Sequence, residues 1–198
     1  MKKGHDLHSI LKECQKLRTP VYVASNGLDI AFQTLIHQID PQTVTLENMV
    51  RPEFISRFAT GSKFFLQCKM LRLQSSKVTP RGSYMVFHIE DNSLTEETRQ
   101  AERFMFAPEE KVIAEILNPF DRATKLRRHV IDMSATGLSV RINSPTTPFQ
   151  PGVRLPEIKV HIDGKLWTNC SADVVYNRKF MDLGGHLRVQ VGLKIINA

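Results

Sequence analysis

The sequence predicts a mainly β protein made of two parts. These are a small N-terminal β-barrel or sandwich module preceded by a short helix, and a C-terminal antiparallel β-barrel. Short segments rich in β-branched and aromatic residues recur along most of the chain. Turn-forming pairs such as Asn26–Gly27 and Asp163–Gly164 separate these segments. In the final segment apolar and polar residues alternate, which is typical of a strand with one buried face.

The length of the chain and a polar segment near its middle predict two domains. The 198 residues suit two domains of about 100 residues each. Glu90–Thr98 is polar and has no periodic set of apolar residues, so we place the boundary there. We therefore expect an N-terminal β-rich module at 1–92, a linker at 93–103 and a β-barrel at 104–198.

The N-terminal half begins with a predicted helix and continues as strands. Apolar residues recur at steps of three and four over residues 5–17, which predicts an amphipathic helix that ends at Thr19–Pro20. A helical turn is expected at Arg51–Phe58, where alternation is missing. The predicted strands are Pro20–Ser25, Leu28–Gln38, Thr43–Glu47, Lys63–Leu73 and Ser83–Glu90, with a turn at Thr79–Gly82.

The C-terminal half has a stronger strand pattern. Val153–Ile162 and Lys165–Asn169 flank Asp163–Gly164, a pair typical of a type I′ hairpin turn. Apolar residues occupy alternate positions of Leu187–Ile196, as in a half-buried antiparallel strand. The other predicted strands are Lys111–Leu117, Arg127–Ile131, Gly137–Ile142 and Cys170–Tyr176, with a turn at Gly184–Gly185. So many strands in half of the chain predict a closed or nearly closed barrel.

An excess of basic residues predicts an anionic partner. The formal net charge is +7 and the sequence pI is about 9.5, which favours a nucleotide, a nucleic acid or an acidic protein surface. The charge alone does not choose among these partners. A basic protein without such a partner stays an open alternative.

Cysteine usage predicts a protein of a reducing cytoplasm. Cys14, Cys68 and Cys170 are odd in number and form no C-x-x-C pair, so neither a zinc site nor a disulfide framework is expected. His5 and His8 are three residues apart, but no carboxylate or cysteine completes a metal site, so no metal is expected. No apolar run approaches the roughly 20 residues that span a bilayer, so no membrane span is expected.

Two short motifs hold the candidate binding residues. Arg99 and Arg103 are four residues apart at the expected domain junction. Like charges at this spacing repel on a helix, whereas two guanidinium groups can share a phosphate or stack on a base. Asp132 and Ser134 offer hydrogen-bond partners for a base edge, and Gly137 permits a turn or a close approach. Each motif alone also fits a simpler interpretation, namely two solvated arginines and an ordinary turn.

Together, an R-x-x-x-R motif at a domain junction and a D-x-S-x-x-G motif between two strands resemble the PilZ family. The resemblance covers roughly Arg99–Asn197, and it includes Asp132–Gly137 in the form DMSATG and the closing strand VQVGLKII. Proteins of this family bind the bacterial second messenger cyclic di-GMP on a small β-barrel. The preceding β-rich half makes the chain similar to the two-domain PilZ proteins that act as flagellar brakes.

The resemblance implies a role for each motif residue. Arg99 and Arg103 would wrap the phosphates and guanine faces of cyclic di-GMP from the linker. Asp132 and Ser134 would take the guanine edge, and Gly137 would keep the loop close to the ligand. The implied function is a non-enzymatic receptor with no cofactor. Ligand binding would order the linker and change the domain arrangement, so that a protein partner such as the flagellar motor or an exopolysaccharide machine is engaged.

Other chemistries fit the sequence less well. Ser134, His129 and Asp132 are the residue types of a catalytic triad, but nearness in sequence is not triad geometry, and no nucleophile elbow surrounds the serine. There is no P-loop and no dinucleotide fingerprint, so an enzyme is not expected. A basic barrel that binds single-stranded nucleic acid is the alternative, although aromatic residues for base stacking are missing from its best candidate segment. That segment contains Arg122, Lys125, Arg127 and Arg128.

Overall fold

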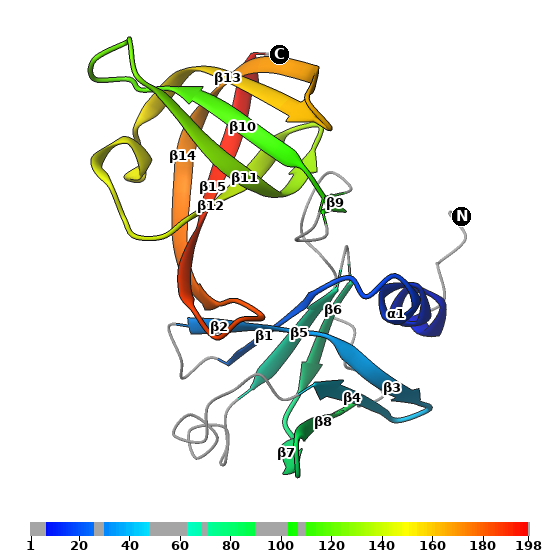
Figure 1. Cartoon of the computed structure of the whole chain (residues 1–198). Coiled ribbons are helices and arrows are strands. Elements are labelled where there is room, and N and C mark those ends of the chain that lie inside the picture. The colour runs from blue at the N-terminus through cyan, green and yellow to red at the C-terminus, as the bar shows by residue number, and fades with distance from the viewer. Residues whose placement is uncertain are drawn as a thin grey trace. The chain divides into compact units, whose positions relative to one another are not determined.

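The computed structural model describes residues 7–25, 30–47, 63–68, 71–89, 103–106 and 110–197. Contacts divide the chain into two compact units, whose elements are labelled in Figure 1. Unit 1 consists of Met1–Arg99 and Phe180–His186, and unit 2 consists of Gln100–Lys179 and Leu187–Ala198. Among the described residues, no helix has the length and apolar character needed to cross a membrane.

Unit 1 contains a helix and two antiparallel sheets. In α1 (Leu7–Lys16) the buried residues Leu11 and Cys14 lie three apart, as the amphipathic pattern predicts. The first sheet has the strand order β2–β1–β5–β6 and the second β3–β4–β8–β7. The bounds are β1 (Val21–Ser25), β2 (Ile30–Thr34), β3 (Ile36–Asp40), β4 (Thr43–Glu47), β5 (Phe64–Cys68), β6 (Leu71–Ser75), β7 (Val78–Arg81) and β8 (Tyr84–His88).

Alternating burial along these strands builds the core of unit 1. In β4, β5 and β8 every second side chain is buried, because successive side chains point to opposite faces of a strand. Phe32, Phe64 and Phe87 are the largest of the fully buried side chains in this core. Burial of such aromatic side chains contributes about 1.5–3 kcal/mol each to folding, so they dominate the stability of the unit.

Two predicted strands of unit 1 are each divided in the structure. The predicted strand Leu28–Gln38 covers β2 and the first part of β3, which belong to different sheets and are separated by Leu35. Lys63–Leu73 is a hairpin of β5 and β6 in which Cys68 pairs with Leu71. The phase of the apolar alternation changes at both breaks, at the adjacent buried residues Leu35 and Ile36 and between Cys68 and Leu71.

The turn between β7 and β8 lies further along the chain than expected. Three residues of the predicted turn Thr79–Gly82 belong to β7, and the turn is formed by Gly82 and Ser83, with Gly82 at φ +59°. The predicted turn at Asn26–Gly27, the helical turn at Arg51–Phe58 and the polar segment Glu90–Thr98 lie outside the described residues.

Cys14 of α1 and Cys68 of β5 are joined by a disulfide bond. The cysteine spacing led us to expect no disulfide framework, and this bond corrects that prediction. The two residues are 54 positions apart in sequence, and they meet because α1 packs against the sheet through its buried face. Cys170, in unit 2, is a free and buried cysteine, and burial raises the pKa of its thiol.

Unit 2 is a closed antiparallel barrel. Within the described residues its strands follow the order β13–β10–β11–β12–β15–β14, and β13 also pairs with β14, which closes the ring (Figure 1). The short strand β9 (Phe104–Met105) pairs with β11 outside this ring. The bounds are β10 (Val112–Leu117), β11 (Lys125–Ser134), β12 (Gly137–Ile142), β13 (Arg154–Ile162), β14 (Lys165–Met181) and β15 (Leu187–Asn197).

Local sequence explains the best-predicted parts of this barrel. Asp163 and Gly164 both have positive φ, at +49° and +79°, as a type I′ turn between β13 and β14 requires. In β15 the side chains of Val189, Val191 and Leu193 are buried in the barrel core, which confirms the predicted alternation. The predicted mainly β fold with a short N-terminal helix is confirmed.

The strand β14 is longer than any sequence pattern indicated. Lys165–Asn169 and Cys170–Tyr176, predicted as separate segments, belong to one strand that continues to Met181. Its last residues belong to unit 1, where the Phe180 ring meets the Tyr22 ring edge-on at 5.8 Å between centroids. The turn before β15 is confirmed, with Gly185 at φ +73°. The β14–β15 hairpin therefore has its strands in the barrel and its tip in unit 1.

Candidate functional site

A β-bulge places Asp132 on the outer face of the barrel. The register between β11 and β12 shifts between Val130 and Asp132, so that Val130 pairs with Val140 and Asp132 pairs with Ser139. Val130 and Val140 are core residues. Ser139 is the neighbour of Val140 along the strand, so its side chain points away from the core, as does that of its partner Asp132.

The Asp132 carboxylate is the centre of a hydrogen-bond network that connects neighbouring strands. Its Oδ2 accepts hydrogen bonds from Ser139 Oγ at 2.6 Å and from Gln190 Nε2 at 3.1 Å. The Gln190 amide nitrogen also donates to Ser139 Oγ at 2.9 Å. Oδ1 forms an ion pair and a hydrogen bond with Arg103. A carboxylate with little solvent exposure needs such partners, so the network fixes its position.

Arg103 is held at the site by strand pairing. Phe104 and Met105 pair with Met133 and Asp132 of β11, and the Phe106 backbone N–H donates to the Ile131 carbonyl at 3.0 Å. These bonds fix the backbone immediately after Arg103. About one fifth of the Arg103 side chain remains exposed while its guanidinium contacts Asp132.

Ser134 and Gly137 shape the turn between β11 and β12. The Ser134 hydroxyl donates to the Gly137 carbonyl at 3.2 Å and accepts from the Thr136 backbone N–H at 3.4 Å. A Cβ atom at Gly137 would lie 2.6 Å from the Leu193 carbonyl oxygen and 3.6 Å from Arg103 Nη2. Of the two roles expected for this glycine, the structure favours close approach, because β12 and β15 could not come this near with a side chain present.

The structure brings four of the five predicted site residues together. Arg103, Asp132, Ser134 and Gly137 all lie around the end of the β11–β12 hairpin. Arg99 lies outside the described residues, and its role stays a prediction.

Sequence reasoning missed two members of the network, Ser139 and Gln190. Both occupy outward positions on strands whose other alternate residues are buried in the core. Ser139 nevertheless has no exposed surface, and a fully buried serine on the outer face of a barrel indicates a specific hydrogen-bond partner. The only sequence feature that pointed to Gln190 as a network member was its position as a polar residue between two valines, which are buried in the structure.

An aromatic ring borders the network. Gly192 pairs with Ser139, and a Cβ atom built at Gly192 would lie 2.0 Å from Cε1 of Tyr176. The Tyr176 ring therefore lies directly over the glycine backbone. This packing places a flat, half-buried aromatic surface beside the Asp132 network.

The geometry does not support a catalytic triad. The partners of the Asp132 carboxylate are Arg103, Ser139 and Gln190, whereas His129 pairs in register with Arg141 on β12. The Ser134 hydroxyl is used by the turn. No group of three or more His, Cys, Asp or Glu side chains among the described residues could hold a metal ion.

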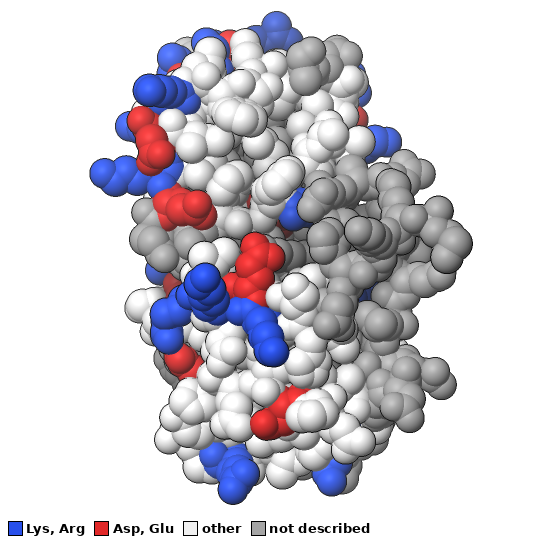
Figure 2. Space-filling view, turned by 90° about the vertical axis from the view of Figure 1, so that its right-hand side faces the viewer, with Lys and Arg blue, Asp and Glu red and all other residues white. Residues whose placement is uncertain are grey.

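The basic run that made nucleic acid an alternative is partly neutralised. Lys125 Nζ forms an ion pair with Glu115 at 2.9 Å, which holds the pKa of Glu115 below its usual value. On the face shown in Figure 2, basic and acidic side chains are interspersed among the described residues, with no continuous basic strip. A long track for a nucleic-acid backbone is therefore not formed on that face.

Comparisons with known proteins identify the fold. No protein-family model matches the chain, and no curated protein matches it significantly. The structure of the K. pneumonia MrkH–c-di-GMP complex is similar with a TM-score of 0.59 at 13% sequence identity, covering 95% of this chain and 83% of that chain. A further structure of MrkH, a c-di-GMP-dependent transcription regulatory factor, has a TM-score of 0.60 at 11% identity and covers 96% of this chain and 81% of that chain.

Escherichia coli YcgR in complex with c-di-GMP is also similar, with a TM-score of 0.51 at 14% identity, covering 96% of this chain and 81% of that chain. Similarity at this level of identity reports on the fold. The chain therefore has the fold of MrkH and YcgR, and the resemblance predicted from the two motifs is confirmed at the level of the fold.

Proposed function

We propose that the chain is a receptor for cyclic di-GMP and that Arg99, Arg103, Asp132, Ser134 and Gly137 contribute to its binding site. The observation that carries this proposal is the contact between the arginine of one motif and the carboxylate of the other on the barrel surface. Proteins of the same fold, MrkH and YcgR, form complexes with c-di-GMP, which supports the proposal. The proposed activity is binding and includes no catalytic step.

Ligand binding at this site requires Asp132 to exchange a partner. A carboxylate has about four acceptor positions, and Asp132 already uses three of them, for Arg103, Ser139 and Gln190. A guanine edge brings N1–H and N2–H donors, so it must displace one of these groups. Displacing Arg103 frees a guanidinium that can grip a ligand phosphate through two parallel hydrogen bonds.

The proposed receptor relays ligand binding to a protein partner by changing the arrangement of the two units. Two connections support this proposal. The predicted linker carries Arg99 and Arg103 between the units. The β14–β15 hairpin has its tip in unit 1, and its strand β15 contributes Gln190 to the Asp132 network. A ligand shifts such an equilibrium only by its different affinity for the two arrangements. The proposed output is control of motility or exopolysaccharide production.

Replacement of Asp132 by alanine is expected to weaken cyclic di-GMP binding and to reduce discrimination against cyclic di-AMP. Adenine lacks the N1–H and N2–H donors of guanine, so a carboxylate acceptor selects for guanine. Affinities for both dinucleotides are measured by calorimetry. Asp173→Ala is the matched control, because it removes a barrel carboxylate that pairs with Arg154 away from the network. If Asp132→Ala excludes cyclic di-AMP as strongly as the unmodified protein, Asp132 does not select the base.

The relay is tested by energy transfer between fluorophores at Ser83 and Lys165, which are exposed residues of unit 1 and unit 2 respectively. The distance distribution between them is expected to change at saturating cyclic di-GMP. The same labels on an Arg103→Ala background control for effects unrelated to the site. An unchanged distribution under saturation contradicts the relay and leaves a local change of the barrel surface as the signal.

A further inference from the structure

A second concave site lies on the same outer barrel face, next to the Asp132 network. It has a volume of about 400 Å³ and is lined by residues of β11, β12, β15 and the segment that follows β12. His129 of β11 pairs with Arg141 of β12, which pairs with Gln190 of β15. Arg141 is two residues beyond Ser139 on the same side of the strand, so the second site starts about 7 Å from the network.

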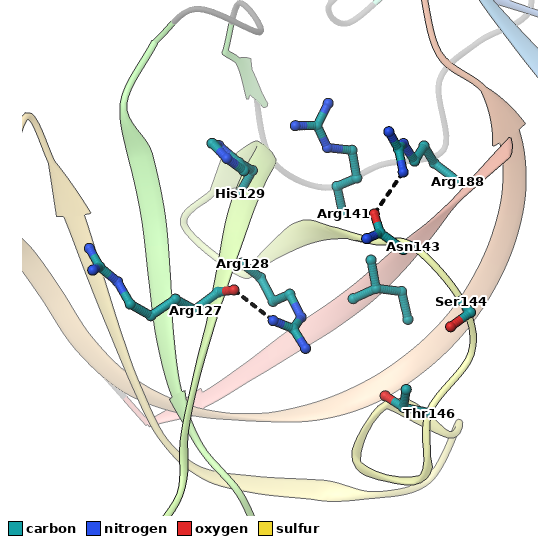
Figure 3. A pocket seen from close by; sticks show the side chains of 9 residues that line it. Arg127, Arg128, His129, Arg141, Asn143, Ser144, Thr146 and Arg188 are labelled. Atoms are coloured by element: carbon teal, nitrogen blue, oxygen red, sulfur yellow. Dashed lines mark hydrogen bonds between the residues drawn. The ribbon is translucent and has the colours of Figure 1, made fainter. Parts of the chain in front are cut away.

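The lining of this site is strongly basic. Four arginines and one histidine contribute to it, and none of its lining residues is acidic. Figure 3 shows the Arg188 side chain directed toward Asn143 and the Arg141 side chain extending from β12, with His129 on the neighbouring strand β11. Burial, with a further contribution from the charge of Arg141, lowers the pKa of His129 from its usual value.

Among the described residues, two of the arginines that line this site, Arg127 and Arg141, lack the ion pairs that other arginines of the chain have. Arg103, Arg154 and Arg18 each form an ion pair with a carboxylate. Within the part of the chain that the structure describes, no hydrogen bond or ion pair is formed by the side chains of Arg127 and Arg141. Adjacent like charges repel, and a bound anion would remove that repulsion.

Neighbouring groups hold the walls of the site in place. Arg188 Nη1 donates to Asn143 Oδ1 at 2.8 Å, and Arg128 Nη1 donates to the Arg127 carbonyl at 2.7 Å (Figure 3). The Arg128 guanidinium also lies over the buried Phe149 ring, 5.7 Å from its centroid. Fixed guanidinium groups lose little freedom when they bind an anion, so Arg128 and Arg188 form a preorganised part of the site.

We propose that this basic pocket binds a phosphate or phosphodiester group of a small molecule. Its volume is in the range of pockets that take nucleotide-sized ligands, which begin at about 300 Å³. Planar guanidinium groups on adjacent strands match the tetrahedral oxygens of phosphate, and Asn143 and Ser144 add polar groups beside them. The phosphate can come from cyclic di-GMP or from another phosphorylated molecule. The pocket is distinct from the Asp132 network and does not depend on the function proposed for it.

The test uses inorganic pyrophosphate as the probe, with the full chain and calorimetry or amide chemical shifts as the readout. The unmodified protein is expected to bind pyrophosphate, with shifts centred on His129 and Arg141. The double variant Arg141→Gln/Arg188→Gln is expected to bind at least about tenfold more weakly, because charge-assisted hydrogen bonds are lost. The matched control is Arg154→Gln, which removes an arginine that is already paired with Asp173 on the same barrel. Its binding should equal that of the unmodified protein.

Two outcomes overturn the proposal. One is the absence of pyrophosphate binding by the unmodified protein at millimolar concentration. The other is a double variant that binds as well as the Arg154→Gln control while its amide spectrum shows an intact fold. Cyclic di-GMP is then titrated into Arg103→Ala to separate the sources of phosphate. If Arg103→Ala still binds cyclic di-GMP and the added double substitution abolishes that binding, the pocket takes the phosphate of cyclic di-GMP. If the pocket binds pyrophosphate but Arg103→Ala shows no such residual binding of cyclic di-GMP, the phosphate comes from another phosphorylated molecule.

Discussion

Arg103→Ala is expected to weaken cyclic di-GMP binding by about tenfold to a thousandfold, because each hydrogen bond to a charged group contributes roughly 1.5–3 kcal/mol and an arginine can form two of them. The substitution also removes the side chain that contacts Asp132 Oδ1. Asp132 keeps Ser139 and Gln190 as partners, so the barrel is expected to stay folded. Calorimetric titration gives the affinity, and urea unfolding gives the stability.

The control for this variant is Arg154→Ala. Arg154 is also a barrel arginine in an ion pair, with Asp173 at 2.9 Å, but it lies outside the Asp132 network. Affinity for cyclic di-GMP should be unchanged in this control. An Arg103→Ala protein that binds as tightly as the control would remove Arg103 from the binding site.

Gly137→Ala is expected to lower both the stability of the barrel and its affinity for cyclic di-GMP. The new Cβ would lie 2.6 Å from the Leu193 carbonyl oxygen, so β12 and β15 must move apart where they now pair. Forcing an extra methyl group into a packed site costs typically about 1–3 kcal/mol. The same movement displaces Arg103 Nη2, which is 3.6 Å from the position of that Cβ, and therefore weakens binding.

Urea unfolding and calorimetry on the Gly137→Ala protein measure the two effects. Thr136→Ala is the neighbouring control, because Thr136 is exposed and contributes its backbone groups to the turn and to β15. Alanine preserves those backbone groups. If Gly137→Ala has the stability and affinity of Thr136→Ala, the close approach of the two strands does not constrain this position.

The parts of the fold that the sequence predicted best are those controlled by local patterns. Asp163–Gly164 favours one turn type by its backbone preferences, and the structure has that turn. In β15 alternation assigns Val189, Val191 and Leu193 to the core without reference to any other segment. Asp132, Ser134 and Gly137 lie together because the β11–β12 hairpin is a short-range structure, whereas Arg103 joins them through the pairing of β9 with a segment of β11 distant in sequence.

Features that depend on distant segments could not be predicted. The Cys14–Cys68 bond follows from the packing of α1 on a sheet, which no spacing rule encodes. Phe180 and Met181 continue the strand pattern of β14, and nothing in that pattern shows that they belong to unit 1 or that Met181 joins its core. Ser139 joins Asp132 only because a bulge after Val130 changes the register, and bulges leave a weak signal in a sequence.

The most direct test of the central claim is a calorimetric titration of the full chain with cyclic di-GMP, alongside the Arg103→Ala and Arg154→Ala proteins. We predict a dissociation constant of about 1 μM or below, equivalent to roughly 8 kcal/mol of binding free energy, for the unmodified protein and for Arg154→Ala. Binding by Arg103→Ala should be at least about tenfold weaker. No heat of binding at millimolar cyclic di-GMP, or equal affinities in all three proteins, would contradict the assignment of a receptor site to Arg103 and Asp132.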